Sequence, residues 1–143
     1  MRLTNEQTCR NERGELVVGS ACEGVILVRM TGMFDAQHCQ TLLAFLQSID
    51  AVSAESFTTF HDLEGMVNYD AAARVELTRW TLARRKKPLA LHFLLRSKIV
   101  ALGLEIANAA LGGSLTTHRD RASFERAYEA AIRASATLSR RRV

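Results

Sequence analysis

The sequence of 143 residues has one proline, few aromatic residues and no long apolar run. With 48% hydrophobic and 24% charged residues, it lacks the composition of a disordered chain, and its length suits one domain. No apolar run approaches the roughly 18 residues that a membrane-spanning helix requires. The first residues, Met1–Glu6, also lack the apolar segment of a signal peptide. We therefore expect a soluble cytoplasmic protein without a membrane span.

Cysteine is scarce, and its spacing argues against two common kinds of site. Cys9, Cys22 and Cys39 are widely separated and form no C-x-x-C pair. Neither a disulfide framework nor a zinc site has this spacing. We expect three reduced thiols, and no residue pattern predicts a metal ion or another cofactor.

Positive charge is concentrated in two clusters. The formal net charge is +4, and Arg79 with residues 84–87 forms one cluster while residues 140–142 form the other. Such clusters can contact phosphates, but cations at a helix end are also favoured by the helix dipole. Aromatic residues do not interleave with them, and Gly112-Gly113 follows a predicted helix, whereas a phosphate-binding loop precedes one. We interpret the clusters as a solvated helix end and a mobile tail, and we expect no specific nucleic-acid binding.

Hydrophobic periodicity and turn residues divide the chain into alternating strands and helices. Two β-prone runs joined by Cys22-Glu23-Gly24 predict an antiparallel hairpin, and four later segments have helical spacing. The predicted strands cover residues 15–21, 25–31, 57–61, 89–95 and 114–117, and the predicted helices cover residues 36–49, 71–85, 98–111 and 121–138.

The order β-β-α-β-α-β-α-β-α is typical of a mixed sheet covered by helices. We predict a single α/β domain over residues 14–138, with four to five strands and about four helices. Residues 1–13 are polar and lack periodicity, so a frayed N-terminus is expected. Residues 139–143 are expected to form a basic tail.

The predicted helix starts carry residues that suit N-capping. Asp35, Asp70, Ser97 and Asp120 each stand just before a helical pattern, where a side-chain oxygen can accept a backbone N–H. Trp80, the largest apolar side chain, is expected in the core or between helices.

The loop Asp62–Asp70 lies where α/β domains usually place their working surface. Its carboxylates can be combined with His61 and His92 into a metal or acid–base site, provided that the strand register places both histidines on one face. The simpler interpretation gives the carboxylates structural roles. No nucleophile–base pair supports catalysis, so we predict a protein without enzymatic activity. His38 and His118 are expected to be exposed.

Three sets of residues stand at the joints of this predicted order: Gly24-Val25-Ile26-Leu27-Val28 with Thr31-Gly32 and Asp35, Asp62-Leu63-Glu64-Gly65 with Asp70, and Asp120 with Phe124-Glu125-Arg126-Ala127. Over roughly residues 15–135 this pattern resembles the STAS domain, the family of bacterial anti-sigma-factor antagonists and sulfate-transporter tails. The SpoIIAA-like relatives fit at least as well. The resemblance implies a non-enzymatic domain that binds protein partners in a bacterial regulatory or assembly pathway, while some members bind nucleotides or lipids.

The chain departs from the family's signalling form at the second helix. Ala71 and Ala72 follow Asp70 where the antagonists carry a phosphorylated Ser or Thr. Alanine has no oxygen to phosphorylate, so we predict an interaction module that is not switched by phosphate. The predicted contact residues are those of the loop and helix start, Asp62, Glu64, Asn68, Tyr69, Asp70 and Ala72. The alternative is a small-molecule or lipid carrier, which requires a closed apolar pocket beneath the second and third helices.

The third predicted helix is apolar on nearly all sides, so it must be buried on nearly all sides. One stripe is expected to cover the sheet, namely Ile99, Leu102, Ile106 and Ala110. The second stripe is either core between helices or a self-association surface, for which a homodimer is the commonest closed form. It consists of Val100, Leu104, Ala107 and Leu111.

Overall fold

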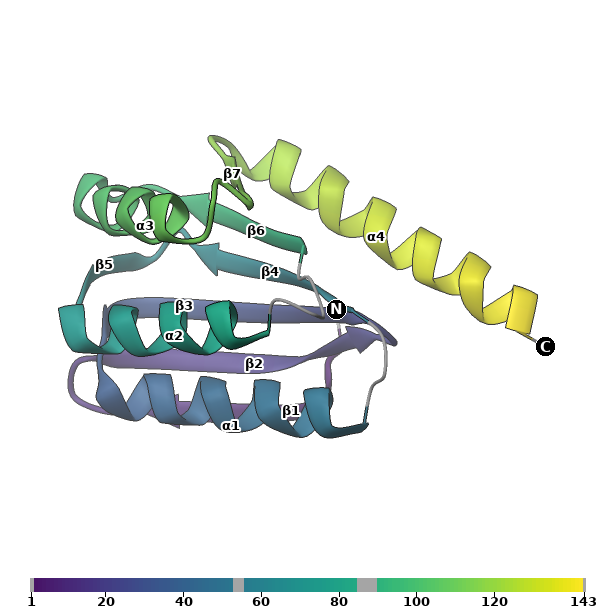
Figure 1. The fold of residues 1–143 in the computed structure, drawn as a ribbon, viewed down its shortest axis with the longest axis horizontal. Helices are drawn as coiled ribbons and strands as arrows, with labels where there is room; N and C mark the ends of the chain where they lie inside the picture. Colours follow the sequence, from purple (N-terminus) through teal and green to yellow (C-terminus); the bar gives the residue numbers. More distant parts are fainter. Residues whose placement is uncertain (1, 53–55, 85–89, 143) are drawn as a thin grey trace.

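The computed structural model describes residues 2–52, 56–84 and 90–142, which form one mixed sheet of seven strands with four helices (Figure 1). The α/β class and the mixed sheet are confirmed, and the strand count exceeds the prediction. In chain order the elements are β1 (Thr4–Arg10), β2 (Gly14–Cys22), β3 (Val25–Phe34), α1 (Ala36–Val52), β4 (Thr58–Leu63), β5 (Met66–Tyr69), α2 (Ala71–Ala83), β6 (Ala90–Leu95), α3 (Lys98–Ala110), β7 (Leu115–His118) and α4 (Arg121–Arg142).

The sheet has the strand order β1-β2-β3-β4-β6-β7. β1, β2 and β3 are antiparallel, which confirms the predicted β2–β3 hairpin, and β3, β4, β6 and β7 are parallel. β5 lies off this path and pairs in parallel with the end of β3. β4 and β5 therefore use successive parts of the same strand, Val25–Arg29 and Gly32–Phe34.

The segment predicted to be frayed instead forms the edge strand β1. Its side chains are mostly exposed and polar, so no apolar alternation indicates a strand in the sequence. Backbone pairing with β2, in register with Cys9 opposite Leu16, holds it in place. At the other end, residues 139–142, which were predicted to form a separate tail, are the last residues of helix α4, which continues to Arg142.

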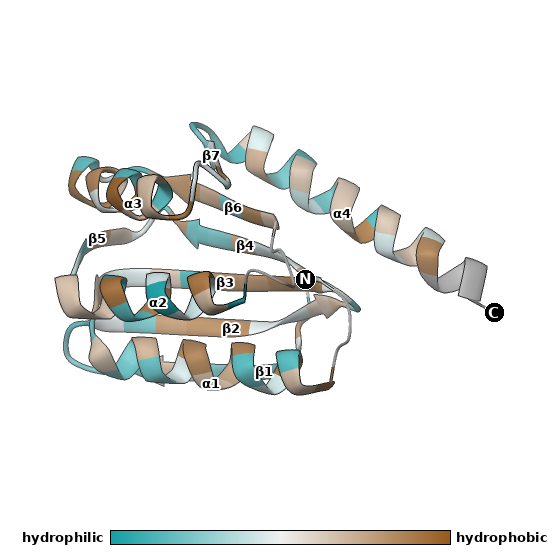
Figure 2. Ribbon diagram, viewed as in Figure 1, coloured by the Kyte–Doolittle hydropathy of each residue, from teal (hydrophilic) through white to brown (hydrophobic). Residues whose placement is uncertain are grey.

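The two faces of the sheet carry separate cores. On one face the core joins the sheet to α1, α2 and α3, and it contains Cys39, Leu42 and Leu46 of α1, which are buried. On the other face Phe124 and Tyr128 of α4 pack against β3, β4 and β6. Hydrophobic residues run along β2 and β3 and through much of α3 (Figure 2). The C-terminal part of α4 extends beyond the sheet (Figure 1).

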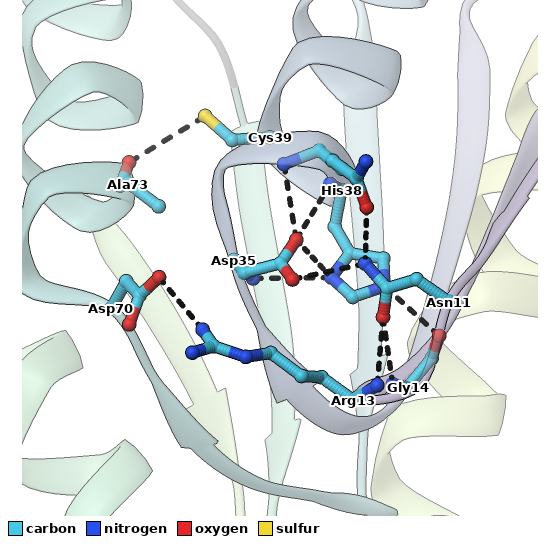
Figure 3. A network of polar contacts seen from close by, with 9 residues as sticks. Asn11, Arg13, Gly14, Asp35, His38, Cys39, Asp70 and Ala73 are labelled. Carbon is cyan, nitrogen blue, oxygen red and sulfur yellow. Dashed lines mark hydrogen bonds and ion pairs between the residues drawn. The ribbon is translucent and has the colours of Figure 1, made fainter.

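A polar network joins the β1–β2 turn to the start of α1 (Figure 3). Asp35 Oδ1 accepts the backbone N–H groups of Gln37 and His38 at 3.0 and 3.2 Å, which confirms the predicted cap. Asn11 Nδ2 donates to Asp35 Oδ2 at 2.9 Å. Burial raises the pKa of Asp35, but the hydrogen bonds from His38 and Asn11 outweigh it and leave this pKa below its ordinary value.

His38 is fully buried in this network, contrary to the prediction that it is exposed. Its Nε2 lies 3.0 Å from the carbonyl oxygen of Gly14, and its Nδ1 lies 3.1 Å from the backbone nitrogen of Asp35. A carbonyl only accepts, so Nε2 carries a proton. Nδ1 also lies 2.9 Å from Asp35 Oδ1. Because both ring nitrogens find backbone partners, the side chain can leave water.

Two of the other three predicted caps form, and the third does not. Ser97 Oγ accepts the N–H of Val100 at 3.3 Å, and Asp120 Oδ1 accepts that of Ser123 at 2.7 Å, as predicted. Asp70 occupies the N-cap position of α2 but makes no side-chain cap hydrogen bond. Its carboxylate instead pairs with Arg13 at 3.2 Å, because the β1–β2 turn brings that guanidinium to the helix start.

Asp35→Ala should destabilise the protein more than Asp120→Ala. Both substitutions remove a helix cap, which costs about 1 kcal/mol. Loss of Asp35 also removes the partner of Asn11 beside a buried histidine, which raises the expected cost to about 3 kcal/mol. Urea unfolding of the two variants measures the difference. Equal losses would show that the network contributes nothing beyond the cap.

Candidate functional site

A cavity of about 140 Å³ lies between the sheet and the three helices of its α1–α3 face. Its wall is mainly apolar and comes from several sheet strands and from all three helices. The apolar lining residues include Leu16, Val28, Met30, Phe34, Leu63, Met66, Leu91, Phe93 and Leu115 from the sheet, Leu42 and Leu46 from α1, Leu77 and Trp80 from α2, and Val100, Leu104, Ala107 and Leu111 from α3 and its end.

Small residues on α3 face this cavity. Gly103 and Ala107 are both in its wall and both buried. The ring of Tyr69 lies directly against Gly103, where an added Cβ would stand 2.4 Å from the tyrosine Cζ. Glycine is therefore required for α3 to approach the end of β5, and neither position 103 nor position 107 places a large side chain in the space.

The cavity wall also contains six polar side chains, namely Thr59, His61, Tyr69, Arg74, Thr78 and Thr81. The hydroxyls of Thr78 and Thr81 donate to α2 carbonyls four residues earlier, at 2.9 and 3.0 Å. His61 Nε2 lies 2.9 Å from Thr59 Oγ1. Arg74 is different, because its Nε is buried without a hydrogen-bond partner in the described part of the chain.

His61 supplies a neutral imidazole to this wall. It is 9% exposed and stacks on Phe93 with ring centroids 4.3 Å apart. Burial, with a smaller effect from the charge of His92, lowers the pKa of His61 to about 3. The ring is therefore uncharged at neutral pH.

His92 faces the opposite side of the sheet from His61. Phe60 pairs with His92 and His61 pairs with Phe93, so successive residues alternate between the faces. The carboxylate–imidazole site that required both histidines on one face therefore does not form. This register could not be read from the sequence, because both strands are short and apolar.

His92 instead joins a polar chain under α4. Its Nδ1 lies 3.0 Å from His118 Nε2, and His118 Nδ1 lies 2.8 Å from Ser123 Oγ. Burial, and then the neighbouring His118, lower the pKa of His92. His118 is half-buried, contrary to the prediction that it is exposed, because it packs edge-on against Phe124.

The predicted contact residues differ in burial and in the contacts they make. Asp62 is buried and accepts Arg121 Nη2 through both carboxylate oxygens, at 3.1 and 3.0 Å. Glu64 reaches the same Arg121 at 3.4 Å. The hydrogen bond from Arg121 to Asp62 raises the arginine pKa despite partial burial. These carboxylates thus attach α4 to the sheet edge.

Two of the remaining predicted contact residues, Asn68 and Asp70, have partners other than Arg121. Asn68 is exposed and accepts the backbone N–H of Tyr69. Tyr69 belongs to the cavity wall, and Asp70 pairs with Arg13. Ala72 is exposed at the start of α2.

The two predicted stripes of α3 are reversed. Val100 and Ala107 are 4% and 7% exposed and face the sheet, and Leu104 and Leu111 line the cavity. The stripe expected to cover the sheet is the exposed one, with Ile99, Leu102 and Ile106 at 55%, 58% and 49%. The hydrophobic periodicity identified both stripes. Because both are apolar, the sequence does not indicate which of them packs against the sheet.

Arg84 is buried, although the sequence placed it in a solvated helix end. It pairs with Asp50 at 2.5 Å and lies 4.7 Å above the ring of Phe57 and 5.1 Å above that of Trp80. Trp80 is partly buried and packs against the core of the α1–α3 face, in line with the expected core position. Arg79 of the same cluster is exposed, as expected, and its other members, residues 85–87, lie outside the described residues.

The three cysteines are free thiols. Cys39 lies near the Ala73 carbonyl oxygen, with Sγ at 3.6 Å (Figure 3). Burial, together with the charge of Glu76, raises its pKa to about 12. The Cys39 thiol is therefore protonated and unreactive at neutral pH.

Comparison with solved structures identifies the fold. No family model and no curated protein matches the sequence. The structure is similar to that of an uncharacterized DUF3478-family protein with a SpoIIAA-like fold from Shewanella loihica PV-4. The TM-score is 0.54 at 10% sequence identity, over 82% of this chain and 87% of that one. This chain has a SpoIIAA-like fold.

No described helix is both long and apolar enough to cross a membrane. No group of three or more His, Cys, Asp or Glu side chains is arranged to hold a metal ion in the described ranges.

His61 should make the protein less stable in mild acid. Its pKa is about 3 when folded, whereas an unfolded histidine titrates near 6.5. Between these values the unfolded chain binds a proton that the folded chain does not, so stability falls as pH drops below about 6.5. The loss from pH 7 to pH 5 is about 2 kcal/mol.

Denaturant unfolding at pH 7 and pH 5 measures this loss. The wild type should lose about 2 kcal/mol more than His61→Phe, which has no titrating group at this position. His92 titrates in both proteins and cancels in the comparison. The same pH dependence in both proteins would contradict the role given to His61.

Proposed function

We propose that this SpoIIAA-like domain binds a small, mainly apolar ligand in the cavity beneath α2 and α3. The observation that carries the proposal is the cavity of about 140 Å³ and its apolar wall. The carrier alternative drawn from the sequence required a closed apolar pocket beneath the second and third helices, and the cavity at this place is apolar but partly open. The exposed Ala71 and Ala72 offer no hydroxyl for a phosphate switch.

The volume of the cavity limits the size of the ligand that it can hold. An engineered apolar cavity of about 150 Å³ in another protein stays dry and binds benzene. The cavity described here therefore suits one aromatic ring or a short aliphatic chain. Pockets for drug-sized ligands are larger, at about 300–1,000 Å³, so a bigger ligand requires α2 or α3 to move.

Benzyl alcohol, a neutral molecule of one ring, should bind the wild type and alter the fluorescence of Trp80, the single tryptophan, which lines the cavity. Ala107→Leu should abolish this response, because Ala107 is buried in the wall and a larger side chain fills the space. Ala109→Leu makes the same change at an exposed position of α3 and should leave binding intact. A wild type without a saturable response, or an Ala107→Leu variant that binds normally, would overturn the proposal.

A second candidate function is interaction with a protein partner through the outer stripe of α3, defined as Ile99, Leu102 and Ile106. These aliphatic side chains are about half exposed, and an apolar patch of this kind is typical of an interaction surface. Val67 of the adjacent β5 is 61% exposed as well. In its simplest form the partner is a second copy of the chain.

Leu102→Glu should abolish self-association while the protein stays folded, because the side chain lies in the outer stripe. Val100→Glu should instead destabilise the fold by several kcal/mol, because it places a charge in the core. Sedimentation at micromolar concentration and circular dichroism measure both outcomes. A wild type that sediments as a monomer would contradict self-association through the outer stripe.

A further inference from the structure

Arg74 is a cation in the wall of an otherwise mainly apolar cavity. It lies in the second turn of α2, and its Nε is buried without a hydrogen-bond partner. The described residues give it no ion pair. The nearest helix-start carboxylate, Asp70, is paired with Arg13 at 3.2 Å.

The other polar groups of the wall cannot balance this charge. A guanidinium stays protonated in proteins. Arg74 is partly buried, and its Nε is a buried donor without a hydrogen-bond partner among the described residues. His61 is neutral, and the hydroxyls of Thr78 and Thr81 already donate to backbone carbonyls. No Asp or Glu is among the described wall residues. The counter-charge is therefore missing from the described part of the protein.

We infer that the ligand of this cavity is a small carboxylic acid, with its apolar body in the cavity and its carboxylate on Arg74. The inference rests on the proposed function and adds the chemistry of the ligand's polar end. A carboxylate accepts N–H groups from one guanidinium in a planar, two-point arrangement. Tyr69, which ends β5 just before α2, is in the same wall and brings a phenol hydroxyl as a second donor.

Charge and size favour a carboxylate over a phosphate. The described wall offers one cation, which matches a single negative charge, and a space of about 140 Å³. A phosphate with up to two charges and three acceptor oxygens would leave most of its hydrogen bonds unmade against such a wall.

Titrations with benzoate and benzyl alcohol, followed by Trp80 fluorescence, test the inference. The two probes share one ring and differ in charge. Arg74→Gln should bind benzoate about tenfold more weakly than the wild type, as expected for loss of a hydrogen bond to a charged group, and should weaken benzyl alcohol binding by a much smaller factor. Arg79→Gln removes the same charge at an exposed position of α2 and should leave both affinities unchanged.

Arg74→Lys keeps the charge without the two-point geometry and should retain part of the benzoate affinity, which separates lost recognition from a damaged fold. If Arg74→Gln binds benzoate as the wild type does while benzyl alcohol still binds, the inference fails and the proposed function stands. If neither probe binds the wild type, the proposed function fails, and the inference fails with it.

Discussion

The register between β4 and β6 decides which chemical groups can meet in this protein. Phe60 lies opposite His92 and His61 lies opposite Phe93, so the pleat sends the two histidines to opposite faces. A shift of one residue would exchange every side chain between the faces. The burial of Phe60 under α4 and the stacking of His61 on Phe93 oppose such a shift. The cavity and the histidine chain are therefore separate environments.

The wall residues of the cavity explain why it is not filled. α3 presents Gly103 and Ala107 to this space, and Tyr69 occupies the place where a larger residue at 103 would stand. Close packing of Tyr69 on the helix backbone thus keeps α3 near β5 while leaving the space beside it open.

Much of the fold follows from local patterns in the sequence. The β2–β3 hairpin, the four helices and the caps at Asp35, Ser97 and Asp120 depend on neighbouring residues, and these were predicted. β1 was missed because its order comes from pairing with β2 and not from its own polar sequence. The burial of His38 was missed for a related reason, since its partner is the carbonyl of Gly14, 24 residues away in the chain.

The candidate site was less predictable, because it is made of contacts between distant segments. The sequence pointed to the loop at residues 62–70, but the structure divides that loop between the α4 attachment at Asp62 and the cavity wall at Tyr69. Arg74 gave no signal, since a polar residue within a helix is ordinarily solvated. The apolar pattern of α3 was recognised, yet its orientation depends on Gly103, the one position where the helix can meet the Tyr69 ring. That contact turns Val100 and Ala107 inward and leaves Leu102 and Ile106 outside, so one small residue places the cavity wall and the outer stripe on opposite sides of the same helix.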